Sequence, residues 1–188
     1  VPIIAANMVG VGNFGVADAL AQHKVFTAIQ KGTSFEEWRK FYKNLNINPH
    51  YSFVTVGLGN DEIELLKRMY DAGYANRIVV DVANGYMNSF AEHVSRVRAA
   101  CPHSFILAGT VCTRDGVYRL KNAGADLVRV GIGSGAVCTT RLVAGVGYPQ
   151  LSAVIECGDG GTNFHGEQLD GEVLLPVVAD GLVEVGVF

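Results

Sequence analysis

"RIVVDVANGYMNSFAEHVSRVRAACPHSFILAGTV", residues 77–111, holds two apolar runs separated by a segment long enough for a helix. The runs at 77–83 and 104–111 are apolar at successive positions rather than at alternate ones, which is typical of strands buried on both faces. The segment 91–100 between them predicts a helix. The stretch therefore predicts a strand, a helix and a second strand, the unit from which parallel sheets are built.

The same unit recurs along the chain. Further apolar runs lie at 2–8, 25–29, 53–58 and 126–133. Helix signals stand between the runs: the candidate N-caps are Ser34 (with Glu37 as a capping box), Ser89 (with Glu92 as a second one) and Thr113. Gly73 and Gly124 stand where a helix ends in a left-handed conformation. The pattern predicts alternating strands and helices.

Two architectures fit this pattern, the open doubly wound sheet and the (β/α)8 barrel. None of the six runs is polar enough for the edge of an open sheet, so we expect an α/β fold of the TIM-barrel type, with residues 1–188 as one domain. A complete barrel takes about 250 residues. The stretch 159–188 breaks the rhythm, so either the barrel is incomplete or segments, including a flap, are joined discontinuously there. The second reading is favoured because an open barrel exposes apolar edges.

The composition limits which binding partners and which cellular location we expect for the protein. A net charge of -3 and a pI near 5.9 create no field that attracts nucleic acid. No apolar run reaches the roughly 20 residues that span a bilayer, and residues 1–8 lack the pattern of a secretory signal. We therefore expect a cytoplasmic protein with no nucleic-acid or membrane partner. The four cysteines match no zinc pattern and are expected to be free thiols.

Polar side chains follow the predicted strands, where barrel enzymes place their reacting groups. Lys31 and Asp81 each end a buried strand, so they either form a salt bridge with each other or contact a ligand. The loop 131–138 contains alternating glycines and ends at Cys138. Such a loop can cradle an anion, present carbonyls to a cation, or be only a tight turn. Cys138 is accordingly either a nucleophile at a strand end or a small buried side chain.

Five motifs give the chain a family resemblance. "GIGSGAVCTTR" followed by "GVGYPQLSAVIEC" closely resembles the catalytic loop of the IMP dehydrogenase and GMP reductase family of (β/α)8 barrels. "IIAANM", "VDVANGY", "FILAGTV" and "NAGADLVRVGIG" are similar to motifs of the same family in the same order. "AANM", "DVANGY" and "GVGYPQLSAV" resemble the reductase versions. Only residues 32–52 separate Lys31 from the next strand, which leaves no room for the regulatory modules that dehydrogenases carry there.

The resemblance implies an NADPH-dependent GMP reductase of purine metabolism. Cys138 would attack C2 of the guanine ring, ammonia would leave, and hydride transfer would release IMP from a thioimidate. The second threonine of the motif, Thr140, would relay a proton with an acidic flap residue, which matches Asp170 in "LDGEVLLPV". Members of the family assemble as homotetramers.

The resemblance also implies binding residues. The cofactor would contact Lys31, Asp81, Val82, Ala83, Thr110, Ile132 and Gly133. The purine nucleotide would contact Ser134, Asp159, Gly160, Gly161 and Gly171. A potassium ion would be held by Gly133, Gly135 and Cys138 through carbonyl oxygens, with Arg141 beside them.

Some positions depart from the family pattern. Val9 and Gly10 follow "NM" where the family has an acidic residue, and Thr110 replaces an asparagine. Ala136 replaces a phosphate-binding serine two residues before the cysteine, a role that Ser134 or the loop N–H groups could take. Two alternatives therefore stay open: an NAD-dependent IMP dehydrogenase, and a non-catalytic member that binds purine nucleotides.

Overall fold

Six parallel strands form the centre of the computed structural model, which describes residues 3–44, 48–136, 138–158, 177–179 and 183–185. The strands are β1 (Ile3–Ala5), β2 (Phe26–Ala28), β3 (Ser52–Val56), β4 (Arg77–Asp81), β5 (Phe105–Val111) and β6 (Leu127–Val130). Each pairs with the next in sequence, all in parallel. All six overlap the apolar runs, so the predicted strands are confirmed.

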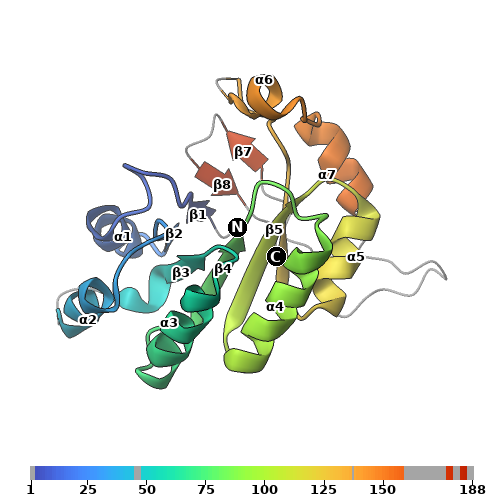
Figure 1. The fold of residues 1–188 in the computed structure, drawn as a ribbon. Coiled ribbons are helices and arrows are strands. Elements are labelled where there is room, and N and C mark those ends of the chain that lie inside the picture. Colours follow the sequence, from blue (N-terminus) through green and yellow to red (C-terminus); the bar gives the residue numbers. More distant parts are fainter. Residues whose placement is uncertain (1–2, 45–47, 137, 159–176, 180–182, 186–188) are drawn as a thin grey trace.

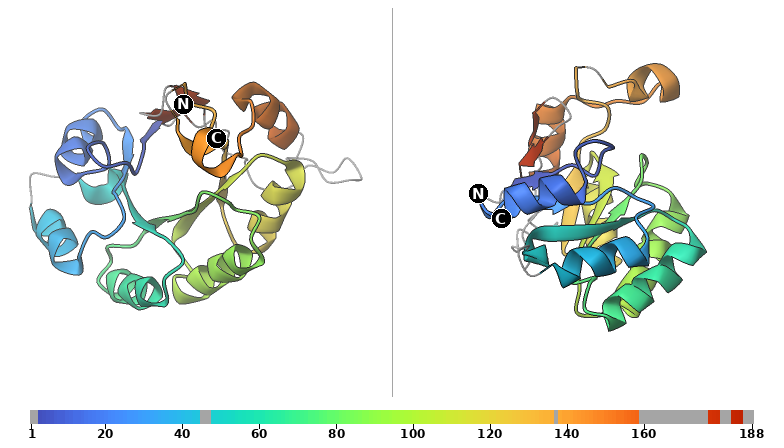
Figure 2. Two further views of the ribbon diagram at one scale, coloured as in Figure 1. Left: turned by 45° about the horizontal axis from the view of Figure 1, so that its top comes forward. Right: turned by 90° about the vertical axis from the view of Figure 1, so that its left-hand side faces the viewer.

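Helices follow the strands and cover one side of the sheet. They are α1 (Phe14–Ala21), α2 (Phe35–Lys43), α3 (Asn60–Asp71), α4 (Asn88–Ala100), α5 (Arg114–Asn122), α6 (Thr140–Ala144) and α7 (Gln150–Gly158), with a 3-10 turn at Pro49–Tyr51. Figure 2 shows α1 to α5 as an arc around the outside of the strands. None of the described helices combines the length and apolar character that crossing a membrane requires.

The strands curl into half of a barrel (Figure 1). At one end of the sheet β1 pairs antiparallel with β8 (Val183–Val185), which pairs with β7 (Val177–Ala179). At the other end β6 has no partner on its outer side among the described strands. The predicted α/β fold of the barrel type is therefore confirmed, and the described strands form an incomplete barrel. The expected flap falls largely within 159–176, outside the described residues.

Two apolar clusters lie on opposite faces of the sheet, because successive side chains of a strand point to opposite sides. The larger cluster packs the helices onto the strands and includes Trp38, Leu66 and Phe90. The smaller one contains strand residues only and lies on the inner face. Its members are Ile4, Ala28, Phe53, Val79, Leu107 and Leu127. This inner face is the interior wall of the half-barrel.

Most of the predicted helix boundaries are confirmed. Ser34 and Glu37 form the capping box of α2, and Thr113 accepts from the Gly116 N–H at the start of α5. The expected cap at Ser89 is wrong, because α4 begins at Asn88 and Ser89 lies in its first turn.

A contact from the next helix explains the earlier start of α4. The side-chain oxygen of Asn88 accepts from the guanidinium of Arg119 on α5, so the chain is already fixed in the helix at that residue. Gly73 and Gly124 have positive φ values of 76° and 105°, and both follow helices as predicted.

Candidate active site

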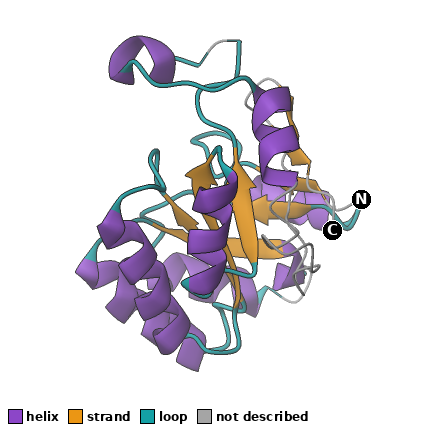
Figure 3. Ribbon diagram, turned by 90° about the vertical axis from the view of Figure 1, so that its right-hand side faces the viewer, coloured by secondary structure: helices purple, strands orange, loops and turns teal. Residues whose placement is uncertain are grey.

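The predicted site residues lie at the carboxyl ends of the strands. Lys31 follows β2, Asp81 ends β4, Thr110 lies near the end of β5, and the loop from Gly131 leaves β6. Parallel strands place their carboxyl ends at one edge of a sheet, so residues far apart in sequence meet there. Figure 3 shows α6 standing away from the strands at this edge, beyond the loop that leaves β6.

Asp81 is the centre of a charged cluster at this edge. Its Oδ2 lies 3.2 Å from Lys31 Nζ and accepts from Asn7 Nδ2 at 3.1 Å. Its Oδ1 lies 2.9 Å from Arg129 Nη1. The Asp81 side chain is only 19% exposed, and a carboxylate this far from water needs such partners. The salt bridge that the sequence allowed between Lys31 and Asp81 is present.

A missing side chain allows the contact between Arg129 and Asp81. The two residues lie on β6 and β4, and Gly109 of β5 stands between them in the register, opposite both. A Cβ on Gly109 would lie 2.6 Å from Cβ of Arg129 and 2.7 Å from its carbonyl oxygen. Arg129 is not among the site residues predicted from the sequence. It could have been identified there as the single charged residue in the apolar strand "LVRV".

Tyr86 ties the loop after β4 to the loop after β5. Its hydroxyl accepts from the Cys112 N–H at 2.7 Å and lies 3.0 Å from Thr113 Oγ1. The Gly85 N–H donates to the Thr110 carbonyl, and the Val82 N–H donates to Gly109. The backbone around Val82 is therefore held directly against β5.

Cys138 lies on the glycine-rich loop and is half-buried. Its Sγ lies 3.3 Å from Thr140 Oγ1. Hydrogen bonds from the side chain and the backbone of Thr140 lower the pKa of the Cys138 thiol, and the positive charge of Arg141 adds to this. A lowered pKa raises the fraction of thiolate near neutral pH, and the thiolate is the nucleophilic form.

The other three cysteines have the opposite character. All three are buried, and burial raises the pKa of Cys101 and Cys112 and raises that of Cys157 to about 12. Among the cysteines, all of which are described and free, Cys138 alone combines access with an activated thiol.

The remaining predicted residues divide into three groups. Ala83 is exposed and Val82 half-buried, whereas Thr110 and Ile132 are buried. Gly133, Ser134, Gly135 and Arg141 lie on the same loop as Cys138. Asp159, Gly160, Gly161, Asp170 and Gly171 lie outside the described residues.

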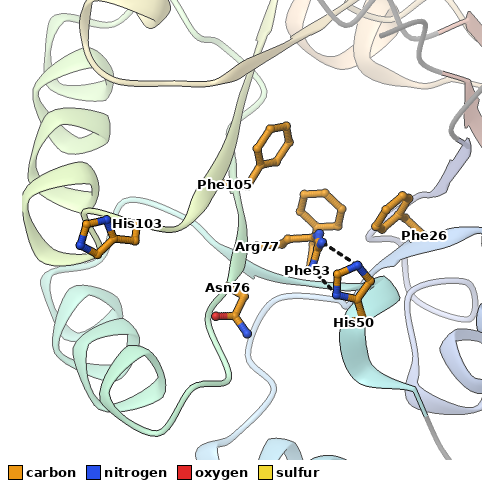
Figure 4. A pocket seen from close by; sticks show the side chains of 7 residues that line it. All are labelled: Phe26, His50, Phe53, Asn76, Arg77, His103 and Phe105. Carbon is orange, nitrogen blue, oxygen red and sulfur yellow. Dashed lines mark hydrogen bonds between the residues drawn. The ribbon is translucent and has the colours of Figure 1, made fainter.

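A cavity lies at the opposite end of the strands. It has a volume of about 480 Å³, and its lining includes Phe26, His50, Phe53, Arg77, His103 and Phe105 (Figure 4). The Arg77 guanidinium carbon lies 5.4 Å from the centre of the Phe26 ring, and Nη2 lies 3.0 Å from His50 Nε2. Of the site residues predicted from the sequence, none of those that the structure describes lines this cavity.

The half-barrel of parallel strands, with an activated cysteine on a loop at a strand end, places the chain in the class of α/β barrel proteins. Sequence comparison identifies the family. The family model described as "IMP dehydrogenase / GMP reductase domain" matches residues 1–186. The chain therefore belongs to this family, as its motifs predicted.

Individual relatives agree with this assignment. The GMP reductase of Vibrio cholerae is 46% identical over 88% of this chain and 48% of its own length. That of Tolumonas auensis is 48% identical over 89% of this chain and 49% of its own length. A crystal structure of inosine 5′ monophosphate dehydrogenase from Legionella pneumophila matches with a TM-score of 0.73 and 30% identity, over 82% of this chain and 46% of that one. The chain thus spans about half the length of these relatives.

Proposed function

We propose that the protein is a GMP reductase, which converts GMP to IMP and ammonia with NADPH as reductant. The observation that carries the proposal is the Cys138 thiol, whose pKa is lowered by Thr140 on an accessible loop at the carboxyl end of the strands. The GMP reductases at 45–48% identity support this reaction over the dehydrogenase reaction.

The described residues fit a two-step reaction. The Cys138 thiolate attacks C2 of the guanine ring, the bond from C2 to the exocyclic nitrogen breaks, and ammonia leaves with a proton passed through Thr140. This leaves a thioimidate on Cys138. NADPH, held by residues that include Lys31 and Asp81, would supply a hydride to C2; breaking of the bond between C2 and sulfur would then release IMP and restore the Cys138 thiolate. Asp170, the proposed partner of Thr140 in the relay, lies outside the described residues.

Part of the proposed cofactor site suits a dinucleotide. The Lys31 side chain is 44% exposed, and its ammonium is held at the rim by the Asp81 carboxylate and by the Asp81 carbonyl oxygen at 3.0 Å. Ala83, two residues after Asp81, is exposed. The remaining contacts to the cofactor would come from Thr110, Ile132 and the neighbouring Gly133. They would be made mainly by backbone atoms, because Thr110 and Ile132 are buried.

The proposed substrate residues are less complete. Ser134 Oγ donates to Gln150 Oε1 at 2.9 Å, so its proton is already used, and a phosphate would depend on the loop N–H groups instead. Asp159, Gly160, Gly161 and Gly171 remain proposals from the family resemblance.

The proposed potassium site does not fit the loop in this conformation. The Gly135 carbonyl accepts from the Cys138 N–H at 3.1 Å and from Arg141 Nη2 at 3.3 Å, so two donors already use this oxygen. The carbonyls of Gly133 and Cys138 alone would supply only two oxygens, which is few for a hard cation that prefers several oxygen ligands. No step above depends on potassium. Tetramer formation, a cytoplasmic location and one barrel domain over 1–188 stay predictions.

The experiment is an activity assay with the purified protein. GMP and NADPH are supplied and the absorbance of the reduced cofactor is followed, with Cys138→Ala as the control. We expect NADPH to be consumed only by the unmodified protein, and mass spectrometry of the quenched reaction to find a purine adduct on the peptide containing Cys138. Reduction of NAD with IMP, without consumption of NADPH with GMP, would establish the dehydrogenase instead, and nucleotide binding without either reaction would establish a non-catalytic member.

A further inference from the structure

The loop that carries Cys138 leaves the sheet and returns to the same strand end. Gly131 directly follows β6, and the Tyr148 N–H donates back to the Ile132 carbonyl at 2.9 Å. Gly131 and Gly133 have positive φ values of 125° and 62°. Glycines at such positions give the chain many alternative conformations, so the loop needs other contacts to hold one of them.

Gln150 supplies two of these contacts with one side chain. Its Nε2 donates to the Val130 carbonyl, the last of β6, at 3.0 Å. Its Oε1 accepts from Ser134 Oγ at 2.9 Å, four residues before Cys138. One amide thus joins the end of the strand to the middle of the loop.

The backbone is shaped around this amide. A Cβ on Gly131 would collide with the Gln150 side-chain oxygen and would lie 3.0 Å from its Cδ and Nε2. A non-glycine residue would therefore displace Gln150 as well as strain the backbone at this φ value.

The helix that carries Gln150 is a rigid support. Gln150 is the first residue of α7, which packs against α5 and β6. Ala153 and Cys157 of α7 are both 0% exposed. The position of the amide is therefore fixed by the core rather than by the loop.

We infer that Gln150 is a positioning residue for Cys138: its amide fixes the glycine-rich loop to β6 and so holds the thiol within reach of the ring carbon that it attacks. The catalytic part of this inference rests on the proposed function, whereas the structural part does not. The role requires both a donor and an acceptor on one planar group, which among side chains of this length only glutamine offers.

Gln150→Leu removes both hydrogen bonds, and Gln150→Glu removes the donor but keeps an acceptor for Ser134. For the leucine variant we expect kcat to fall by about 10- to 100-fold, because a thiol displaced by about 1 Å loses that much. KM should rise less than kcat falls, and the glutamate variant should lie between. Ser152→Ala, an exposed position on the same helix, is the matched control and should keep full activity.

Hydrogen exchange separates this inference from the proposed function. In Gln150→Leu the amides of Gly131 and Tyr148 should exchange faster while those of α7 from Ala153 onward keep their protection. The pH midpoint of Cys138 alkylation should not move, because Thr140 sets the thiol pKa. If the protein has no reductase activity but the loop amides respond in this way, the proposed function fails and the anchoring stands.

A double-mutant cycle tests the contact itself. Ser134→Ala and Gln150→Leu remove the same hydrogen bond. The double variant should therefore change loop exchange and kcat by less than the sum of the two single variants. Additive effects, or unchanged exchange of the loop amides in Gln150→Leu, would overturn the inference. So would a shifted alkylation midpoint with unchanged exchange, because the glutamine would then act on the charge of the thiol and not on its position.

Discussion

The two ends of the half-barrel each hold an arginine on the inner face of the sheet, in different surroundings. At the carboxyl end, Arg129 lies 2.9 Å from Asp81, and its side chain is 21% exposed. At the amino end, Arg77 has no ion pair in the described part of the chain. It stacks over Phe26 and lies against His50, which accepts from it through a ring nitrogen.

The difference supports the carboxyl end of the strands as the candidate active site. Lys31, Asp81 and Arg129 form an ion-paired cluster at the carboxyl end of the strands, where fixed charges can act on a bound ligand. A cation over aromatic rings mainly adds packing and modest stability. This agrees with the rule that barrel enzymes react at the carboxyl ends of their strands, while the amino end serves stability.

The largest expected effect tests this division by activity. Cys138→Ala at the carboxyl end should reduce GMP turnover by about 10³-fold or more, since no other group can form the covalent intermediate. His50→Ala at the amino end should leave turnover within about twofold. Steady-state kinetics on both variants, each checked for unchanged thermal unfolding, decides the matter. Equal losses of turnover at the two ends would contradict the division.

The next effect concerns the charged cluster. Asp81→Asn leaves Lys31 and Arg129 without their carboxylate, so the free energy of unfolding should fall by about 2–4 kcal/mol. This is somewhat less than the roughly 3–5 kcal/mol of a broken, fully buried pair, because Asp81 is partly exposed. Urea denaturation measures it. Adding Arg129→Met to Asp81→Asn should recover part of the loss, because the cation that has lost the Asp81 carboxylate is then gone. No recovery in the double variant would show that the two residues do not interact.

A smaller effect on stability is expected at Gly109 of β5, which lies between Asp81 of β4 and Arg129 of β6. Gly109→Ala places a methyl group within 2.6 Å of Arg129 Cβ and should destabilise the protein by about 1–3 kcal/mol through overpacking. Gly10→Ala is not a suitable control because of its positive φ, so Gly15→Ala in α1, whose nearest neighbour would be the Asn13 side chain at 3.3 Å, is used instead. Thermal unfolding compares them. A Gly109→Ala protein as stable as the Gly15→Ala protein would place Arg129 elsewhere.

The amino-end arginine should matter less. Arg77→Met keeps most of the apolar contact with Phe26 but loses the cation–π interaction and the hydrogen bond to His50, so stability should fall by only about 1–2 kcal/mol. Chemical denaturation beside Asp81→Asn gives the comparison directly. A loss as large as that of Asp81→Asn would mean that both ends depend equally on their charges.

The last prediction concerns the pKa of the Cys138 thiol, measured as the pH dependence of its alkylation. The hydrogen bond from Thr140 lowers the pKa of Cys138, so Thr140→Val should raise that pKa and move the alkylation curve to higher pH, with slower alkylation at neutral pH. Thr140→Ser keeps a hydroxyl and should stay near the unmodified protein. Iodoacetamide labelling followed across pH provides the measurement. Coincident curves for the valine and serine variants would remove Thr140 as the cause.

Local patterns in the sequence predicted the elements well. The strands were visible as apolar runs, and the capping residues Ser34 and Thr113 were visible because a cap acts within four residues. The error at Ser89 has a non-local cause, since the start of α4 depends on Arg119, 31 residues from Asn88. Cys138 was identified from its motif, but the motif did not reveal that Gln150 holds the loop.

The sequence by itself determined the order of strands and helices, the end of the sheet where polar residues gather, and the cysteine that differs from the other three, because periodicity and short motifs encode these locally. Only the tertiary structure decided that Asp81 meets Arg129, 48 residues away, across the space left by Gly109, and that Gln150 reaches back to Val130. The physical reason is that such contacts depend on strand register and on how a helix docks, which no stretch of neighbouring residues specifies.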